Sequence, residues 1–489
     1  MSNFSKKRTI LSMLLVMPLL GWSQGTASST KATENALAKV AKMDNPVVDI
    51  PSTDENQKLG DYYGANAKAI LAYEWGYALV RMESIMREYV NVPNPKPATS
   101  YRAPLNQMGW ATELPTAKDT DMPSANRDTY YMSAVVDLTE PYVVSVPDTH
   151  DRYYVINVFD MYQNLSAYIG RRETGTKAGN YAIVPPGWEG TLPTSINKTI
   201  HVKTPKVWLW GRLRIEQGED TAPVIALQKD FKLQTLNEFK GGTSPNKTTN
   251  LPKMPTYPKT DPLAFYKQLA WAMTQNPVID VDKALVGQFE SIGLSPGKFD
   301  ESVLNDIQKK ALYDATLQAP LSIMASIKTS SYVKNGWNFV TKLSDFGWDY
   351  TLRSMIAGPY LGGNGAEEAL YPVRYTDSEG NTLDGNNTYK IHFKEEPPVD
   401  AFWSLTLWNA KTKMFVDNPL NRYKMSPDIE GFKKNADGSF DITISNQQPE
   451  NTDNWIPANK GPFYIILRLY QPQQIVLDEN YDIPDVKKI

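Results

Sequence analysis

The sequence predicts a mainly β protein that also contains a helical domain, with two β-sandwich regions joined through a helical segment. Three observations support this fold class. Short apolar runs of strand length recur over residues 126–216 and again from 371 onward, separated by Pro, Gly and Asp. Between them, residues 261–361 change to the three- and four-residue spacing of amphipathic helices. The frequent turn signals between short strands favour sandwiches over a parallel sheet.

The N-terminus has the layout of a secretory signal peptide. Lys6, Lys7 and Arg8 form a basic region, and the apolar residues 10–20 follow before a polar, small-residue exit. This apolar run is shorter than the about 20 residues that span a bilayer, although an uncleaved N-terminal anchor is the alternative. We therefore expect residues 1–24 to be removed and the mature protein to be periplasmic or secreted, without stable membrane insertion.

Composition excludes several classes of function. The chain has no cysteine, which excludes a disulfide framework, a cysteine nucleophile, thiolate-bound zinc and an iron–sulfur cluster. Its formal net charge is −3, and loss of the basic leader makes it more negative, so we expect no nucleic-acid partner. Tyr (27) and Trp (12) together outnumber Phe (15). Such rings suit sheet packing, which is the simpler interpretation, and also sugar- or aromatic-binding surfaces.

The changes of pattern along the chain predict a series of segments after the signal peptide. We expect, in order, a mobile lead-in at 25–61, a long helix packing with the helical domain at 62–98, a β-sandwich at 99–216, a linker at 217–258, the helical domain at 259–361 and a jelly-roll-like β domain at 362–489.

The clearest helix covers residues 66–90, where apolar residues recur three and four apart. The proline-rich stretch 92–97 ends it, because proline lacks a backbone donor. Glu83 and Arg87 are expected to form an i, i+4 pair on its outer face. Glu74 is expected to be an exposed acid at the rim of the apolar stripe, with a site carboxylate as the alternative.

Strand patterns are densest in the first β region. Runs at 133–138 and 142–146 flank a short turn and predict antiparallel neighbours. The run 153–162 is apolar on both faces, which predicts a central strand that is covered on both sides. Further strands are expected at 181–184 and 207–215.

Helical patterning is expected to continue through Trp337, Leu343 and Tyr350 before the second β region begins. Strands with jelly-roll-like spacing are then expected at 389–393, 401–408, 439–444 and 463–470.

Two sets of sequence blocks carry a family resemblance. The first set is 126–130 (NRDTY), 137–138, 152–154 (RYY), 160, 170–179, 186–188 (PGW) and 211–212 (GR). The second set is 364–371, 389–393 (YKIHF), 402–405 (FWSL), 418–423, 454–457 (NWIP) and 467–472 (LRLYQP). They resemble two bacterial families known as domains of unknown function 1254 and 1214, which are usually found together in one exported chain. The resemblance implies an immunoglobulin-like sandwich, a helical domain and a jelly-roll, and it brings no activity and no catalytic residues.

Local motifs give no catalytic signature. Residues 293–297 fit the G-x-S-x-G pattern, but Pro296 has no N–H for an oxyanion hole, so we expect a turn that stops a helix. The basic stretch 170–175 is interpreted as a hairpin tip with solvated charges, with an anion-binding loop as the alternative.

Histidine and metal chemistry is equally limited. His201 and His392 are expected to face solvent. His150 lies next to acids and Arg152, where a structural turn is favoured over a His–Asp base. No metal or cofactor is expected, although carboxylates could bind a divalent cation such as Ca²⁺ or Mg²⁺. The candidate ligands are Asp128, Asp137, Asp148, Asp151 and Asp160, with His150.

The best candidates for a binding site are polar residues that the strand pattern places on apolar faces. Asp160 needs a cationic or hydrogen-bonding partner there, which Arg152, Arg212 or Arg468 could supply. Such an Asp–Arg pair either lines a pocket or holds the sheets of the sandwich together, and we favour the second interpretation. Asn126, Asn421 and Asn454 share this ambiguity. The candidate ligand-binding residues are Asp128, Tyr130, His150, Arg152, Tyr154, Asp160, Trp403, Arg422, Trp455 and Arg468.

Two classes of function remain open. In the first, the protein is an enzyme or carrier that binds or transforms a small polar or aromatic molecule in an inter-domain cleft. In the second, it is a non-catalytic binding or assembly module that acts through its β-sheet surfaces, for example as a homo-oligomer. We favour the first, because Tyr-, Trp- and Arg-rich motifs occur in both β regions.

Overall fold

The computed structural model of the chain describes residues 38–95, 100–119, 124–244 and 249–489. It contains helix and strand in nearly equal shares, 27% and 26%, as several antiparallel sheets and a long helical segment. Both expected kinds of structure are present, but the helical share is larger than a mainly β class implies. The predicted signal peptide lies outside the described residues.

The chain divides into two units, residues 1–61 and 62–489. The described part of the first unit contains the short helix α2 (Pro46–Asp49) and the first turns of α3 (Asp54–Val90). The segment that was expected to be a mobile lead-in therefore contains helical turns in its described part. Ala65, Ala69 and Ala72 continue the buried face of α3 N-terminal to Trp75, and small side chains give a weak apolar signal in the sequence.

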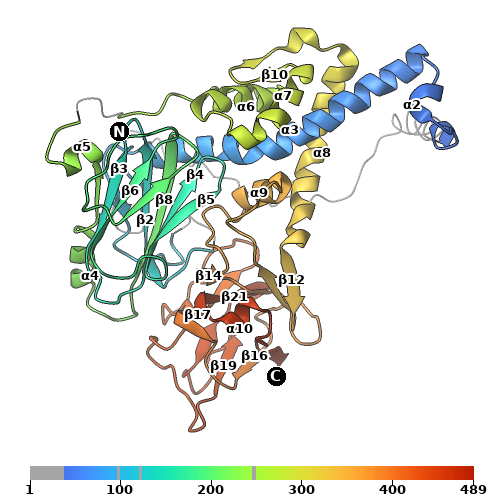
Figure 1. Cartoon of the computed structure of the whole chain (residues 1–489). Helices are drawn as coiled ribbons and strands as arrows, with labels where there is room; N and C mark the ends of the chain where they lie inside the picture. Colours follow the sequence, from blue (N-terminus) through green and yellow to red (C-terminus); the bar gives the residue numbers. More distant parts are fainter. Residues whose placement is uncertain (1–37, 96–99, 120–123, 245–248) are drawn as a thin grey trace, which may run out of the picture. The chain divides into compact units, whose positions relative to one another are not determined.

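The first β region consists of two sheets (Figure 1). The larger has the order β1 (Gly109–Trp110), β2 (Thr129–Asp137), β8 (Lys206–Arg214), β4 (Tyr154–Asp160) and β5 (Leu165–Gly170). The smaller has the order β7 (Lys198–His201), β6 (Gly179–Val184), β3 (Tyr142–Val146) and β9 (Lys232–Thr235), in which only the β6–β7 pair is parallel. One apolar cluster joins the facing sides of the two sheets.

Strand β4 confirms the prediction of a strand covered on both sides, since all seven of its residues are buried. The expected β2–β3 hairpin was wrong. β2 pairs with β8 over nine residues, whereas β3 pairs with β6 and β9 in the other sheet. Alternation of apolar residues predicts a strand but does not select its partner.

The predicted linker 217–258 was also wrong in its first half. Helix α4 (Thr221–Gln228), strand β9 and helix α5 (Leu236–Phe239) lie there. Asp220 caps α4, and Thr235 with Glu238 forms a capping box at α5. Because this segment is rich in Lys and Thr, its composition resembles that of a linker.

The helical region contains α6 (Ala264–Gln275), η1 (Asp280–Asp282), α7 (Lys283–Gly287), η2 (Gln288–Ile292), the hairpin β10 (Leu294–Ser295) and β11 (Lys298–Phe299), η3 (Glu301–Val303), α8 (Asp306–Ala325), η4 (Ser326–Thr329) and α9 (Tyr350–Ala357). Gly293 ends η2 with a φ of 76°, which confirms the helix-stop turn. Trp75 of α3, Leu269 of α6 and Trp208 of β8 share one apolar cluster, so α3 packs with the helical region and with the first β region.

Helix α3 ends at Val90, as predicted, but two of its acids, Glu74 and Glu83, are buried. Glu83 is fully buried and is bonded to Arg87, to Lys206 Nζ at 3.0 Å and to Asn276. Glu74 is 9% exposed and accepts a hydrogen bond from Thr351. The Glu83–Arg87 pair is present as expected, but the expected exposure of Glu83 and Glu74 was wrong, because segments distant in the sequence cover these acids.

The second β region also has two sheets. The larger has the order β12 (Ser331–Lys334), β13 (Trp337–Val340), β15 (Val373–Arg374), β21 (Phe463–Pro472), β17 (Val399–Asn409) and β18 (Lys424–Met425), with β14 (Ala369–Leu370) also paired to β21. The smaller has the order β20 (Trp455–Pro457), β19 (Phe440–Ser445), β16 (Tyr389–Phe393) and β22 (Val486–Lys488), and α10 (Gln474–Leu477) follows β21. The four strands expected here are present as β16, β17, β19 and β21.

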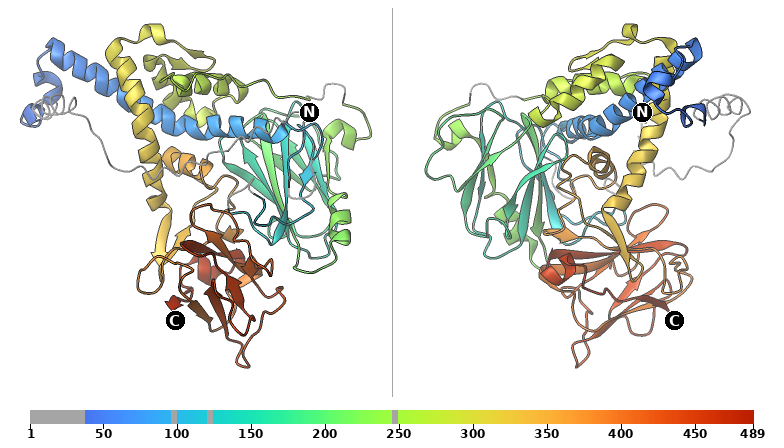
Figure 2. Two further views of the ribbon diagram at one scale, coloured as in Figure 1. Left: turned by 180° about the vertical axis from the view of Figure 1, so that it is seen from behind. Right: turned by 45° about the vertical axis from the view of Figure 1, so that its right-hand side comes forward.

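Strands β12 and β13 correct one expectation. They occupy residues 331–340, where helical patterning was predicted to continue, and β13 joins the larger sheet through β15. Figure 2 shows this hairpin following the end of α8. In the part of the chain that the structure describes, no helix is long and apolar enough to cross a bilayer.

Candidate functional site

The larger sheets of the two β regions meet face to face, and we call this contact the seam. Along β17 and β21, Leu405 and Leu467 point into the second region's core. Their neighbours Ser404 and Arg468 therefore point the other way, toward the first region. Rings confirm the contact, since the Tyr153 ring lies 5.1 Å from that of Phe402.

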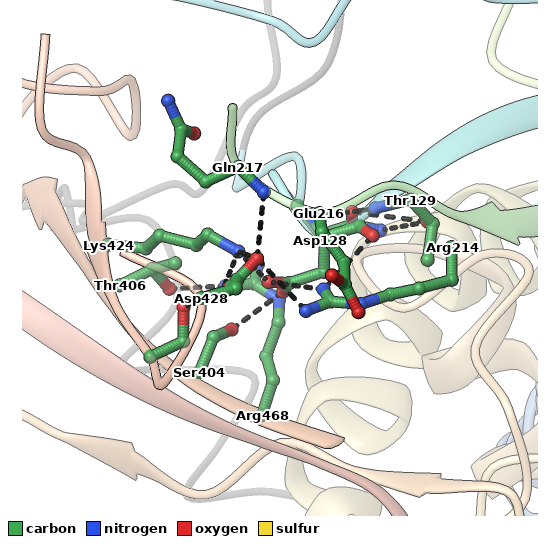
Figure 3. Close-up of polar contacts among 12 residues, drawn as sticks. Asp128, Thr129, Arg214, Glu216, Gln217, Ser404, Thr406, Lys424, Asp428 and Arg468 are labelled. Atoms are coloured by element: carbon green, nitrogen blue, oxygen red, sulfur yellow. Dashed lines mark hydrogen bonds and ion pairs between the residues drawn. The ribbon is translucent and has the colours of Figure 1, made fainter. Parts of the chain in front are cut away.

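A buried cluster of four charges lies at one end of the seam (Figure 3). Asp128, which is fully buried, accepts from Lys424 Nζ at 2.8 Å and from Ser404 Oγ at 2.6 Å. Arg214 Nη1 lies 3.4 Å from the same carboxylate. Asp428 supplies the second negative charge of the cluster. Its Oδ2 lies 3.1 Å from Lys424 Nζ and 3.0 Å from Arg214 Nη2.

Local structure holds Asp128 in place. The side-chain oxygen of Asn126 accepts from the backbone N–H groups of Asp128 and Thr129, both at 2.9 Å. This turn directly precedes β2, so the carboxylate projects from the start of the strand. Asn126 thus positions the charge cluster and takes no direct part in it.

The electrostatics make this cluster a lock between the two β regions. Burial raises the pKa of Asp128, but Lys424 and Arg214 more than offset that effect and hold it below its usual range. The same balance lowers the pKa of Asp428. Both carboxylates are ionised at neutral pH, and neither is poised as a proton acceptor. The cluster therefore fixes the register of the seam and does not resemble a general base.

A second buried contact involves the basic stretch 170–175. Glu368 is 1% exposed and accepts from Tyr153 at 2.6 Å and from Arg172 at 3.2 Å. Arg171 donates to Gln471 at 2.8 Å. The expected hairpin tip with solvated charges was wrong, because the second β region covers it. Burial raises the pKa of Glu368, while the Tyr153 hydrogen bond and the Arg172 charge lower it in part.

A narrow cleft opens between the two β regions next to the seam. Counted with its open side, it has an empty volume of about 500 Å³. Aromatic rings make up much of its wall, with Trp408 and Phe415 at a centroid distance of 4.0 Å. The lining residues are Ser100, Tyr101, Arg102, Pro115, Asp119, Ala125, Tyr131, Trp408, Met414 and Phe415. The enclosed part of this slot is only water-sized, so a planar group would bind at its open side.

Two buried arginines, Arg212 and Arg468, lie close to rings that line this cleft. The Arg212 guanidinium lies 5.8 Å from the Tyr131 ring, and that of Arg468 lies 5.6 Å from the Trp408 ring. Among the sequence candidates, the structure thus brings Asp128 and Arg468 to the seam and places them on opposite sheets.

The structure places the candidates of the first β region elsewhere. Tyr130 and Tyr154 point into the apolar core between the two sheets. The His150 side chain is 85% exposed, in a turn where its backbone N–H donates to Asp148. Arg152 holds Glu219 with two hydrogen bonds of 2.8 and 2.9 Å.

Asp160 has none of the three arginine partners that were considered for it. Its carboxylate accepts from the backbone N–H groups of Tyr162 at 2.8 Å and Asn164 at 2.9 Å. Burial raises its pKa, which these bonds and the charge of Arg353 lower in part. Asp160 thus stabilises the turn between β4 and β5.

The remaining candidates serve the second region's own structure. Trp403 packs in its core and donates to Glu396 at 2.7 Å. Trp455 donates to Ser445 Oγ at 3.0 Å. Arg422 donates to three backbone carbonyls, those of Thr452, Trp455 and Glu430. Asn421 and Asn454 adopt left-handed turn conformations with φ of 49° and 51°.

Several residues of the seam were missed by sequence reasoning, namely Tyr131, Arg214, Tyr371, Lys424 and Asp428. One signal was present in β8, where Trp208, Trp210, Arg212 and Arg214 alternate with Val207, Leu209, Gly211 and Leu213. That alternation gives one face two arginines and two tryptophans. Within the described residues, no group of three or more acids and histidines is arranged to hold a metal ion.

Fold and site together define a protein in which two β regions, joined by a helical region, meet across a buried polar seam. Residues 105–235 match the family described as "Protein of unknown function (DUF1254)", and residues 368–474 match "Protein of unknown function (DUF1214)". The chain therefore carries a DUF1254 region followed by a DUF1214 region, as the sequence blocks suggested.

Two solved structures match the chain, and the first of them has a similar architecture. The VPA0106 protein from Vibrio parahaemolyticus is 25% identical, with a TM-score of 0.68 over 87% of this chain and 100% of that chain. An uncharacterized protein from Burkholderia cenocepacia is 12% identical, with a TM-score of 0.41 over 95% of this chain and 96% of that chain. No curated protein matches the chain significantly.

Proposed function

We propose that this protein, as a carrier or as an enzyme, binds a small polar or aromatic molecule in the cleft between its two β regions. The observation that carries this proposal is the cleft wall, to which Tyr101 and Tyr131 contribute from one region and Trp408 and Phe415 from the other. Rings on opposite sides of a narrow slot are suited to hold a planar group by stacking and edge contacts.

The buried charge cluster supports this function, because a lock between the regions keeps the two cleft walls at a constant separation. Lys424 is 1% exposed and touches both Asp128 and Asp428, so it ties the two sheets together beside the cleft. Preorganised walls reduce the conformational entropy that a ligand must remove on binding.

We also propose the finer architecture and the location of the protein. The two pairs of sheets are consistent with an immunoglobulin-like sandwich in the DUF1254 region and a jelly-roll-like sandwich in the DUF1214 region. The basic residues 6–8 followed by the apolar residues 10–20 support export to the periplasm or the medium. Mass spectrometry of the N-terminus of the exported protein would test the cleavage expected near residue 24.

One observation favours the alternative, an assembly module. Helix α8 exposes Tyr313, Leu317, Leu321 and Met324, which are 45–63% exposed and three or four residues apart. This spacing forms one apolar stripe on the helix. If this stripe on α8 contacts another molecule, the assembly surface lies on the helical region and not on the β sheets.

A thermal-shift screen of the mature protein tests the binding function. The panel contains sugars, aromatic acids, lipids and divalent ions, and we expect an aromatic compound to raise the melting temperature. Trp408→Ala should abolish that shift, whereas Trp348→Ala, a 76% exposed tryptophan that does not line the cleft, should leave it intact. A flat response across the panel would favour the assembly module.

A further inference from the structure

Arg212 is buried without a carboxylate partner among the described residues. Its residue exposure is 6%, and its guanidinium donates to the Asn364 side-chain oxygen at 3.0 Å and to the Gly362 carbonyl at 3.3 Å. Its Nε has no hydrogen-bond partner at all. The neighbouring rings are Tyr131 and Trp210, at 5.8 and 5.7 Å. This cation therefore has neutral neighbours only.

Arg468 is in the same situation on the opposite sheet. It is 4% exposed and donates to Thr406 Oγ1 and, at 2.8 Å, to the carbonyl of Ser124. In the described part of the chain no acid lies within ion-pair distance of it, although the acid Asp128 bonds to Ser404, its direct neighbour across the β17–β21 pair.

The charges of Arg212 and Arg468 both act on the hydroxyl group of Tyr371. Asn364, which accepts from Arg212, donates to the hydroxyl of Tyr371 at 2.9 Å. Burial raises the pKa of Tyr371, and the positive charges of both Arg212 and Arg468 lower it in part. Tyr371 is only partly buried. Arg212 and Arg468 thus both lie close enough to Tyr371 for their charges to act on its hydroxyl.

Four other buried cations of the described structure have an ion-pair partner. Lys424 and Arg214 have Asp128 and Asp428, Lys206 has Glu83, and Arg374 has Asp485. Two more, Arg127 and Arg353, have none among the described residues, although nearby acids partly offset the effect of burial on their pKa. Burying a charge without a counter-charge costs several kcal/mol. Arg212 and Arg468 lack an ion pair and lie next to rings that line the cleft, so they are the buried cations best placed to receive a charge from a ligand.

We propose that Arg212 and Arg468 form an anion site for the carboxylate group of a small aromatic ligand, a ligand class that rests on the binding function proposed above. The planar fork of arginine matches a carboxylate with two parallel hydrogen bonds. The ring of the ligand would lie between Tyr131 and Trp408 in the cleft, and its carboxylate would face the two guanidinium groups. The buried Nε of Arg212, which has no partner within the protein, is one donor that such a carboxylate would satisfy.

Isothermal titration calorimetry of the mature protein with benzoate and with benzamide tests this site. The two probes have the same ring and nearly the same shape, but only benzoate is charged. We expect benzoate to bind at least about tenfold more tightly, since each tenfold step corresponds to about 1.4 kcal/mol. Arg212→Gln and Arg468→Gln should each weaken benzoate about tenfold or more and leave benzamide unchanged.

Thermal melting distinguishes a binding role from a structural one. Because Gln removes an uncompensated buried charge and keeps one donor, both variants should melt at or above the wild-type temperature. The matched control is Arg374→Gln, which breaks a buried arginine's ion pair with Asp485 at 2.7 Å. It should lower the melting temperature and leave benzoate binding intact. Lower melting temperatures for both site variants, with unchanged benzoate affinity, would overturn the anion site.

The remaining outcomes separate the two proposals. Equal affinity for benzoate and benzamide, lost in Trp408→Ala, supports the aromatic cleft and overturns the anion site. Binding of acetate that depends on Arg212, without binding of either aromatic probe, supports the anion site and contradicts the aromatic cleft. Inorganic phosphate binding more tightly than either carboxylate would overturn the carboxylate class. No binding of any probe overturns both proposals.

Discussion

Replacing Asp128 with Asn is the most direct test of the lock between the two β regions. The change keeps the shape of the side chain and removes its charge. Lys424, whose side chain is 1% exposed, then keeps only Asp428, at 3.1 Å. Removing one partner of a buried ion pair costs about 3–5 kcal/mol. Since Asp428 remains, we expect the free energy of unfolding to fall by about 3 kcal/mol, at the lower end of that range.

Urea denaturation followed by tryptophan fluorescence measures this loss. Combining Asp128→Asn with Lys424→Met should recover part of it, because the buried cation is removed together with its partner. The control is Asp441→Asn, which breaks an exposed pair with Lys390 at 3.4 Å and should cost only about 0–1 kcal/mol. A loss below about 1 kcal/mol for Asp128→Asn, or strict additivity with Lys424→Met, would refute the lock.

The pH dependence of this loss has a defined sign. The pKa of Asp128 is lowered from 3.8 in the folded protein. Its stabilisation is therefore fully present above the unfolded-state pKa and is lost as the pH falls from there through the lower, folded-state pKa. The difference in stability between wild type and Asp128→Asn should be constant from pH 5 to 7 and should shrink below about pH 4.

Three further predictions concern other parts of the chain. Asp160→Asn keeps one acceptor and should change stability by less than about 1 kcal/mol, whereas Asp160→Ala orphans two buried N–H groups and should cost about 2–3 kcal/mol in the same assay. Gly362→Ala should cost about 2 kcal/mol or more and weaken benzoate binding. Gly362 has a φ of 70°, and a Cβ would come within 2.7 Å of Trp208. Leu317→Gln with Leu321→Gln should leave urea stability within about 0.5 kcal/mol, and a smaller mass in light scattering would identify α8 as an assembly surface.

The sequence alone determined the elements whose signal is local. The strand β4, the end of α3 at Val90 and the four main strands of the second β region follow from apolar periodicity and proline. The turn at Gly293 follows from the ability of glycine to adopt the left-handed conformation that ends a helix, and the missing N–H of Pro296 excludes a nucleophile elbow there. Two sets of sequence blocks were also enough to indicate the DUF1254 and DUF1214 regions by resemblance.

Only the tertiary structure decided which of these elements meet. The sequence could not show that β2 pairs with β8 rather than β3, or that Glu83 lies against Lys206, because both contacts join segments far apart in the chain. The same holds for the site. Arg212 and Arg468 are separated by 256 positions in the sequence, and each alone resembles an arginine at a sheet surface. Their significance lies in the absence of a counter-charge within reach, and that depends on every residue packed around them.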